Sequence, residues 1–269
     1  MGSPFFKKSL GQHHLVDPAL CRPLVEFLRP DGERVLEIGP GGGVLTTALL
    51  AAGARVLAWE VDPDWAAVLR ARLPDPRLAL VVGDALEIPW DRLPAPTLVA
   101  GNLPYNVATA IIERLFPHQE RVPRAAFLVQ KEVADRLVAG PGDEAYGSLS
   151  VLTAAYAEAR LLGRVKRGSF RPPPKVEGAF VGFTLHAPPL PADEMPGFVR
   201  MVRLAFNQRR KTLRNALGAD WGREKAEAVL GAAGVGARVR AEEVGLSGFL
   251  EIYGQQQALA PMAEGSYHD

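Results

Sequence analysis

The four residues Asn102-Leu103-Pro104-Tyr105 form the most specific chemical motif in the sequence. An exocyclic aromatic amine is a poor nucleophile, because its lone pair is delocalised into the ring. The Asn102 side-chain oxygen and a main-chain carbonyl in Leu103-Pro104 could accept both amine protons and aim the nitrogen lone pair at an electrophile. Proline fixes the turn, and the Tyr105 ring offers a surface for an extruded base. The motif predicts group transfer to an aromatic amine, and its structural alternative is an Asn-Pro turn with a buried tyrosine.

A glycine-rich turn, Gly39 to Gly43, follows the apolar run Val35–Ile38. Such a turn at the carboxyl end of a strand is where doubly wound folds hold a nucleotide. Three acids, Glu37, Glu60 and Asp84, accompany the first three expected strands, and together they would repel a pyrophosphate. The site therefore suits a nucleoside cofactor with a positive centre and no phosphate, which describes S-adenosylmethionine better than NAD. Taken singly, each acid could also be a solvated carboxylate at a strand end.

A second aromatic side chain, Phe170, lies in a loop with three successive prolines, Pro172 to Pro174, and flanking cations. This ring could sandwich a base against Tyr105, since stacking contributes about 1–3 kcal/mol per base. The alternative is a core phenylalanine that closes a hairpin.

Basic residues are concentrated in two segments without acids, 160–176 and 200–218. One such run is often a solvated helix face, but two indicate a polyanionic partner such as RNA. We expect the two runs to form one RNA surface. The candidate RNA contacts are Arg164, Lys166, Arg167, Arg171, Lys175, Arg209, Arg210 and Lys211.

The elements that must position these residues follow an alternating pattern of short apolar runs and helical segments, which is typical of a parallel sheet covered by helices. The expected strands are 34–38, 55–60, 78–82, 97–102, 125–129, 160–166 and 179–186, and the expected helices between them are 45–52, 65–72, 109–115, 132–139 and 148–157. Because no helix separates the last two strands, they should pair antiparallel at the sheet edge. After the proline-rich spacer 187–192, helices are expected at 193–217, 221–233 and 242–253. The sequence thus predicts an α/β, Rossmann-like seven-stranded domain, residues 1–187, and a small all-α domain, residues 192–269.

Composition restricts the class of protein. The chain has 269 residues, of which 48% are hydrophobic and 23% charged, an ordinary globular composition. No uncharged stretch reaches the roughly 20 apolar residues of a membrane helix, so we expect no membrane association. The single cysteine, Cys21, excludes an internal disulfide framework and a cysteine-based zinc site. With no secretion signal evident, these features favour the cytoplasm.

Several motifs together resemble the ribosomal RNA adenine dimethylases of the KsgA type, a family related to the erythromycin-resistance methylases. The resemblance covers nearly the whole chain. It includes 8–15, 37–43, 102–105, 130–136, 146–150 and 170–176, and the segment 205–215 resembles the KsgA branch specifically.

The resemblance implies transfer of methyl groups from S-adenosylmethionine to N6 of two adjacent adenosines in the 3′-terminal hairpin loop of small-subunit rRNA, without a metal. The substrate would be rRNA in an immature 30S particle, and the enzyme a monomer. The implied catalytic residues are Asn102, Leu103, Pro104, Tyr105 and Phe170. The implied cofactor contacts are His13, Leu15, Gly39, Gly41, Glu60, Asp84, Ala85 and Asn102. One departure concerns the N-terminal segment, where His13-His14 replaces the family's usual Asn-Phe.

Three other functions compete with this interpretation. An antibiotic-resistance methylase would act on large-subunit rRNA. A non-catalytic RNA-binding assembly factor could retain the same fold, although the intact Asn102–Tyr105 motif argues against it. A nicotinamide oxidoreductase would need a phosphate-compatible site, which the acids disfavour.

Overall fold

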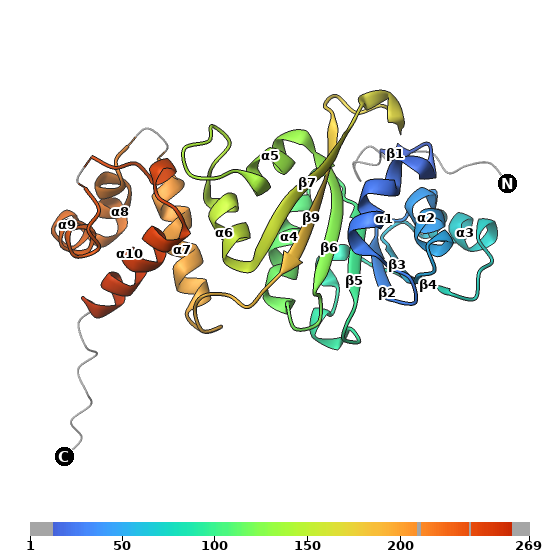
Figure 1. Cartoon of the computed structure of the whole chain (residues 1–269), viewed down its shortest axis with the longest axis horizontal. Helices are drawn as coiled ribbons and strands as arrows, with labels where there is room; N and C mark the ends of the chain where they lie inside the picture. The colour runs from blue at the N-terminus through green and yellow to red at the C-terminus, as the bar shows by residue number, and fades with distance from the viewer. Residues whose placement is uncertain (1–12, 209–210, 237, 260–269) are drawn as a thin grey trace, which may run out of the picture. The chain divides into compact units, whose positions relative to one another are not determined.

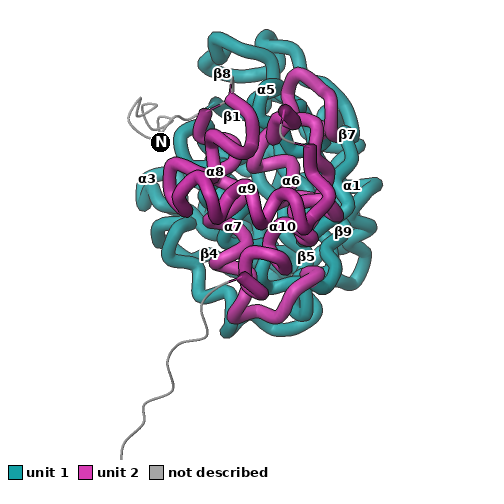
Figure 2. Tube along the Cα trace, turned by 90° about the vertical axis from the view of Figure 1, so that its left-hand side faces the viewer, with its two compact units in different colours: residues 1–138, 156–187 teal, residues 139–155, 188–269 magenta. Residues whose placement is uncertain are grey.

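The computed structural model describes residues 13–208, 211–236 and 238–259, which form two compact units (Figure 2). The first unit comprises residues 1–138 and 156–187, and the second comprises 139–155 and 188–269. The break at 187 coincides with the expected domain boundary, but the segment 139–155 differs from the expectation by grouping with the C-terminal helices. This segment groups with the C-terminal part of the chain because it is hydrogen-bonded to it. The Tyr146 hydroxyl donates to Val244 O, and Gly142 N donates to Glu242 O.

A seven-stranded sheet forms the centre of the first unit, in the order β4-β3-β2-β5-β6-β9-β7. Its strands are β2 (Arg34–Ile38), β3 (Arg55–Glu60), β4 (Leu78–Val82), β5 (Leu98–Asn102), β6 (Arg124–Gln130), β7 (Ala157–Val165) and β9 (Gly178–Leu185). β2 to β6 pair in parallel, whereas β9 runs antiparallel to both β6 and β7. The seven-stranded Rossmann-like architecture and the antiparallel pair at the sheet edge are therefore confirmed.

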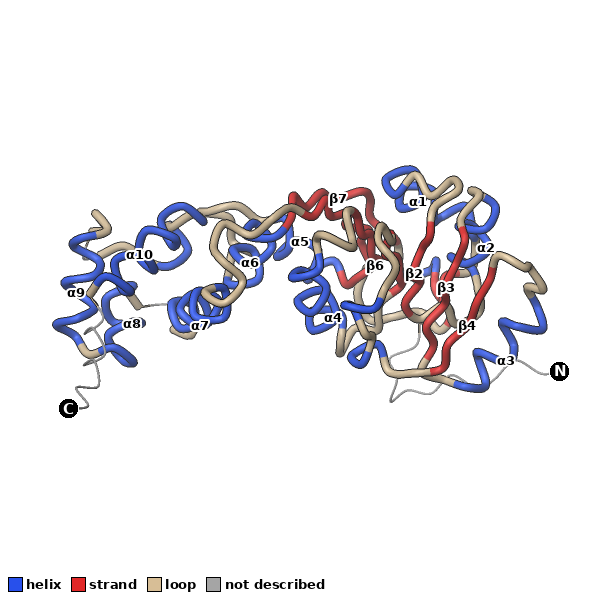
Figure 3. Tube along the Cα trace, turned by 90° about the horizontal axis from the view of Figure 1, so that it is seen from below, coloured by secondary structure: helices blue, strands red, loops and turns tan. Residues whose placement is uncertain are grey.

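Helices cover this sheet, as Figures 1 and 3 show. They are α1 (Arg22–Leu28), α2 (Val44–Ala51), α3 (Pro63–Arg72), α4 (Ala108–Leu115) and α5 (Lys131–Val138). α1 follows a short 3-10 helix (Pro18–Cys21) and packs against β6, β7 and β9. Neither α1 nor this 3-10 turn is among the expected helices. Gly182 of β9 permits the close approach of α1, because a Cβ there would lie 2.8 Å from the Phe27 ring.

A second, two-stranded sheet joins β1 (His14–Leu15) to β8 (Phe170–Arg171). His14 faces Arg171 and Leu15 faces Phe170 in the antiparallel register. This small sheet, called the N-terminal ribbon below, was not foreseen from sequence because two-residue strands carry no periodic signal.

The second unit is helical in its described residues. It contains most of α6 (Ser148–Tyr156), with α7 (Met195–Phe206), α8 (Leu213–Trp221), α9 (Arg223–Ala232) and α10 (Leu246–Ala258). The single helix expected at 193–217 is wrong, since the chain is extended at Thr212 (ψ 155°) before α8 begins. Leu213 N donates to Val239 O, a partner outside any local helix, and this bond is incompatible with one uninterrupted helix. None of the described helices has the length and apolar character required to cross a membrane.

Candidate active site

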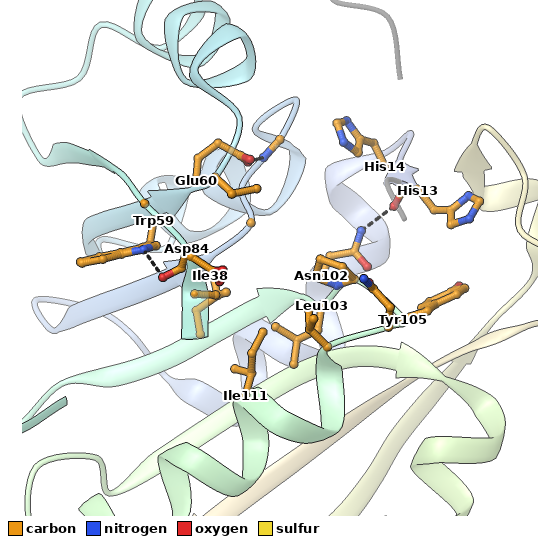
Figure 4. A pocket seen from close by; sticks show the side chains of 18 residues that line it. His13, His14, Ile38, Trp59, Glu60, Asp84, Asn102, Leu103, Tyr105 and Ile111 are labelled. Carbon is orange, nitrogen blue, oxygen red and sulfur yellow. Dashed lines mark hydrogen bonds between the residues drawn. The ribbon is translucent and has the colours of Figure 1, made fainter. Parts of the chain in front are cut away.

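A cavity opens in the first unit where β2, β3 and β5 end and where the chain leaves β4 (Figure 4). Glu60, Trp59 and Asp84 lie on one side of this cavity, and Asn102, Tyr105 and His13 lie on the other. Its described lining consists of His13, His14, Ile38, Gly39, Gly41, Trp59, Glu60, Val61, Gly83, Asp84, Ala85, Asn102, Leu103, Pro104, Tyr105, Asn106, Val107 and Ile111. The structure thus brings together the glycine turn, the strand-end acids and the amine motif.

The glycine turn after β2 depends on backbone conformations that favour glycine. Gly39, Gly41 and Gly43 have φ values of 66°, 49° and 81°, in the left-handed region that other residues rarely adopt. Gly41 also lacks room for a side chain, because a Cβ there would lie 2.6 Å from the His14 ring. The turn therefore exposes main-chain atoms to the cavity.

Glu60, at the end of β3, holds two loops at once. Its carboxylate accepts hydrogen bonds from Gly41 N at 3.0 Å and from Asp62 N at 2.9 Å. Burial raises the pKa of Glu60, and these two hydrogen bonds oppose the effect. A carboxylate has about four acceptor positions, so Glu60 can also accept from a ligand hydroxyl.

Asp84 and Trp59 form the adjoining wall of the cavity. Asp84 caps a 3-10 helix (Ala85–Glu87) by accepting from Leu86 N at 2.8 Å. The Trp59 indole donates to the Asp84 main-chain carbonyl at 3.1 Å. Sequence reasoning did not single out Trp59, although its place immediately before the strand-end Glu60 was a usable signal. Ala85 lines the same wall as expected.

The amine motif continues from β5 into α4. Leu103 N donates to Leu128 O at 3.0 Å and fixes the turn to the neighbouring strand. The Pro104 carbonyl accepts from Val107 N and Ala108 N at the start of α4, at 3.1 and 3.0 Å. Because no described main-chain donor bonds the Leu103 carbonyl, it is the better of the two carbonyls for a ligand amine.

Tyr105 also lines the cavity and is partly buried. Its hydroxyl has no hydrogen-bond partner among the described residues, and burial raises its pKa. The His13 imidazole lies over it, with ring centroids 5.4 Å apart and planes tilted by 31°.

Leu15 and Phe170, expected as cavity contacts, are not on the cavity lining. Leu15 is 5% exposed and Phe170 2%, and they pair across the N-terminal ribbon within the hydrophobic core. In this structure the Phe170 ring packs in the core, which agrees with the alternative that it is a core phenylalanine.

His14 is a site residue that sequence reasoning left without a role. Its Nδ1 accepts from Gly42 N at 3.3 Å, and its ring packs edge-on against Trp65 at 4.4 Å. Burial, with a smaller effect of His13, lowers the pKa of His14 to about 4. A neutral imidazole is required here, since a protonated one could not accept the Gly42 hydrogen bond.

The expected RNA contacts are distributed over both units. In the first unit, exposed cations occupy the end of β7 and the loop that leads to β9, and none has a carboxylate within 4 Å in the described structure. They are Arg164, Lys166, Arg167, Arg171 and Lys175. In the second unit, Lys211 is exposed in the connection between α7 and α8, whereas Arg209 and Arg210 lie outside the described residues. Arg214 pairs with Glu227 at 3.2 Å.

Glu37, in β2, is not among the residues that line the cavity. Its side chain is 1% exposed, and neither carboxyl oxygen has a well-formed hydrogen bond in the described structure. Burial raises its pKa to about 8, against a smaller opposing influence of Thr46. Of the three acids expected near the cofactor, only Glu60 and Asp84 reach the cavity. The described residues contain no group of three or more His, Cys, Asp or Glu side chains arranged for a metal ion.

The parallel sheet with its antiparallel edge, and a cavity lined by strand-end acids, the glycine turn and the Asn102–Tyr105 motif, are those of an S-adenosylmethionine-dependent methyltransferase. A family model described as "Ribosomal RNA adenine dimethylase" matches residues 5–257. The chain belongs to that family.

Named relatives agree with this assignment. "Ribosomal RNA small subunit methyltransferase A" of Synechococcus sp. (strain JA-3-3Ab) is 42% identical over 93% of this chain and 92% of its own length. The protein of the same name from Pseudomonas putida (strain KT2440) is 37% identical over 94% and 97%.

Two solved structures share the fold. The 23S rRNA methyltransferase ErmE superposes with a TM-score of 0.69 at 28% identity, over 90% of this chain and 99% of its own. A dimethyladenosine transferase from Plasmodium falciparum has a TM-score of 0.77 at 21% identity, over 91% and 98%.

We predict that Glu37→Gln changes the pH dependence of stability. The native pKa of about 8 lies above the ordinary value of 4.5, so the native state binds more protons at Glu37 between these values, and the contribution of Glu37 to stability falls as pH rises from 4.5 to 8. Glutamine does not titrate, so the free energy of unfolding of the variant, relative to that of the wild type, should rise over this range. The rise should reach about 1–4 kcal/mol at pH 8. Urea unfolding at pH 5, 6.5 and 8 measures the difference.

The matched control is Glu26→Gln, which removes an exposed carboxylate paired with Arg22. Its stability difference from wild type should stay nearly constant with pH. A Glu37→Gln difference that is equally constant would contradict the raised pKa.

Proposed function

We propose that the protein transfers methyl groups from S-adenosylmethionine to N6 of two adjacent adenosines in the 3′-terminal hairpin loop of small-subunit rRNA. The observation that carries the proposal is the single cavity in which the acid-lined nucleoside site meets the Asn102–Tyr105 motif. Family membership and relatives named for small-subunit rRNA support the substrate. The likeness to ErmE makes large-subunit rRNA the alternative to exclude.

The residues on the side of the cavity that contains Glu60 and Asp84 fit this cofactor. The glycine turn presents main-chain atoms without a side chain in the way, and Glu60 and Asp84 make the wall negative, which suits a cationic sulfonium and disfavours phosphate. Bound S-adenosylmethionine supplies an electrophilic methyl group. Glu60 would accept from the ribose hydroxyls and Asp84 from the adenine amine, with Gly39, Gly41, Ala85 and His13 along the same cavity.

The residues of the second wall orient the target amine. The Asn102 Oδ1 and the Leu103 carbonyl accept its two protons, which directs the nitrogen lone pair toward the methyl group. Pro104 holds the turn, and Tyr105 stacks on the extruded adenine. Phe170 contributes by anchoring the ribbon that crosses this wall.

The RNA partner is proposed to be the rRNA of an immature 30S particle, bound by a cytoplasmic monomer. The five exposed cations of the first unit and the segment Arg209 to Lys211 of the second would contact phosphates. Such contacts position the RNA, while the cavity selects the base.

The cofactor assignment predicts that Glu60→Ala weakens S-adenosylmethionine binding at least tenfold. The variant loses up to two charge-assisted hydrogen bonds to the ribose, each worth roughly 1.5–3 kcal/mol, and frees the Gly41 turn. Calorimetric titration of the folded variant measures the affinity. Glu87→Ala, which removes an exposed acid near Asp84 outside the cavity lining, should bind normally. Equal affinity in Glu60→Ala and wild type would sink the assignment.

The amine-orienting role predicts that Asn102→Ala loses most turnover. Its single-turnover rate on immature small subunits should fall at least a hundredfold, since the acceptor in contact with the amine is gone. Tyr105→Ala should instead chiefly weaken capture of the adenine, with cofactor affinity near wild type in both variants. Transfer of radiolabelled methyl to small-subunit and large-subunit rRNA gives rate and substrate together. Wild-type rates in Asn102→Ala, or methylation of large-subunit rRNA alone, would refute the proposal.

The RNA assignment predicts a reduced salt dependence in the triple variant Arg164→Ala/Lys166→Ala/Arg167→Ala. Each lost phosphate contact flattens the log–log salt slope by roughly 0.7–0.9, so binding of a 16S 3′-terminal hairpin RNA should lose a slope of about 2. Arg160→Ala is the matched control, because Arg160 lies in the same strand and pairs with Glu158 at 2.7 Å. An unchanged slope in the triple variant would move the RNA site away from β7.

A further inference from the structure

The Asn102 side chain is held by the main chain of the N-terminal segment. Its Nδ2 donates to the His13 carbonyl oxygen at 2.7 Å (Figure 4). A carbonyl oxygen can only accept a hydrogen bond, so the amide nitrogen, and not its oxygen, must face His13. The two orientations of an asparagine amide have nearly the same shape, and this bond selects one of them. The other orientation would bring Oδ1 against a second acceptor.

The position of the His13 carbonyl is itself determined by the N-terminal ribbon. The His13 ring Nδ1 lies 2.8 Å from the Pro172 carbonyl, to which it donates. Beyond it, β1 pairs with β8, and Val16 N donates to Ser169 O at 3.1 Å. Leu15 and Phe170 anchor this pairing in the core. The carbonyl is therefore placed by a packed element and not by a free chain end.

We propose that the N-terminal ribbon is a positioning element for the methyl-transfer reaction. The His13 main-chain carbonyl takes the amide N–H of Asn102 and thereby leaves Oδ1 as the acceptor for the target amine. Leu15 and Phe170 are positioning residues that act through this carbonyl from outside the cavity. The inference rests on the proposed role of Asn102 and adds the group that orients it.

The variant Asn102→Asp tests whether the orientation of the Asn102 amide matters, or whether any hydrogen-bond acceptor at this position is enough. It keeps the shape of the side chain and an acceptor oxygen, but the ionised carboxylate has no N–H for the His13 carbonyl and is repelled by it. If a hydrogen-bond acceptor for the target amine were sufficient, the variant would be as active as wild type near pH 8. We expect its single-turnover rate, with saturating cofactor and immature small subunits, to be at least thirtyfold lower.

Acidification should restore the variant. A protonated carboxyl donates its O–H to the His13 carbonyl and accepts with its other oxygen, as the amide does. The rate relative to wild type should therefore rise about tenfold per pH unit toward the pKa of the introduced carboxyl, followed by carbon-13 NMR. A rate within twofold of wild type at pH 8, or no recovery once NMR shows the carboxyl protonated, overturns the inference. Neither result touches the proposed function, which fails if Asn102→Ala reacts at the wild-type rate or if large-subunit rRNA alone is methylated.

Variants of Leu15, which anchors the N-terminal ribbon in the core, provide a second and independent test. Leu15→Ala should lower the single-turnover rate at least fivefold with little change in cofactor affinity, and Leu15→Met should restore the rate. Leu28→Ala, a truncation in the same core on α1, should lower stability without slowing the reaction. Equal rates for Leu15→Ala and Leu28→Ala would show that the ribbon does not position Asn102.

Discussion

Parallel pairing of four adjacent strands is the constraint on which the site depends. β2 pairs with both β3 and β5, so Ile38 lies beside Trp59 on one side and Gly101 on the other. β4 extends the same arrangement, with Glu60 opposite Val82. Since parallel strands end at the same edge of a sheet, the polar residues that follow each strand must meet there. The strand ends therefore assemble most of the cavity, and the N-terminal ribbon adds His13 and His14.

Hydrogen bonds and ring contacts then join the segments at that edge. Glu60 binds the glycine turn and the loop after β3 through its two oxygens. The N-terminal ribbon crosses the same region, where His14 packs against the glycine turn and the His13 carbonyl binds Asn102. Apart from the Glu60–Asp62 bond, each of these bonds links residues at least 19 positions apart in the chain. The ribbon therefore contacts both sides of the cavity, the glycine turn through the His14 ring and Asn102 through the His13 carbonyl.

Glu37 and Glu60 are two buried acids of the first unit, and their burial carries an energetic penalty. Burial raises the pKa of both Glu37 and Glu60, so keeping their charged forms in the native state is unfavourable for stability. Only Glu60 of these two acids lines the cavity, where the positive charge of the proposed cofactor would compensate its charged form.

Periodicity predicted the strands and most helices well, because a buried parallel strand leaves an apolar run whatever its neighbours are. It failed at 193–217, where a single bond from Leu213 N to Val239 O competes with helix continuation. It also assigned the segment 139–155 to the first domain, since Tyr146 shows no local sign of its bond to Val244. These failures share one cause, namely partners distant in sequence.

The sequence by itself identified the candidate site residues, because the amine motif and the glycine turn are local patterns whose residue types limit what they can do. Only the tertiary structure decided which of the candidates reach the cavity. The residue types of Leu15 and Phe170 do not show whether these side chains contact a ligand or each other. The register of the N-terminal ribbon buries both. The orientation of the Asn102 amide was equally open, since it depends on a carbonyl 89 residues away. Contacts between distant segments arise only when the chain folds, so no local pattern encodes them.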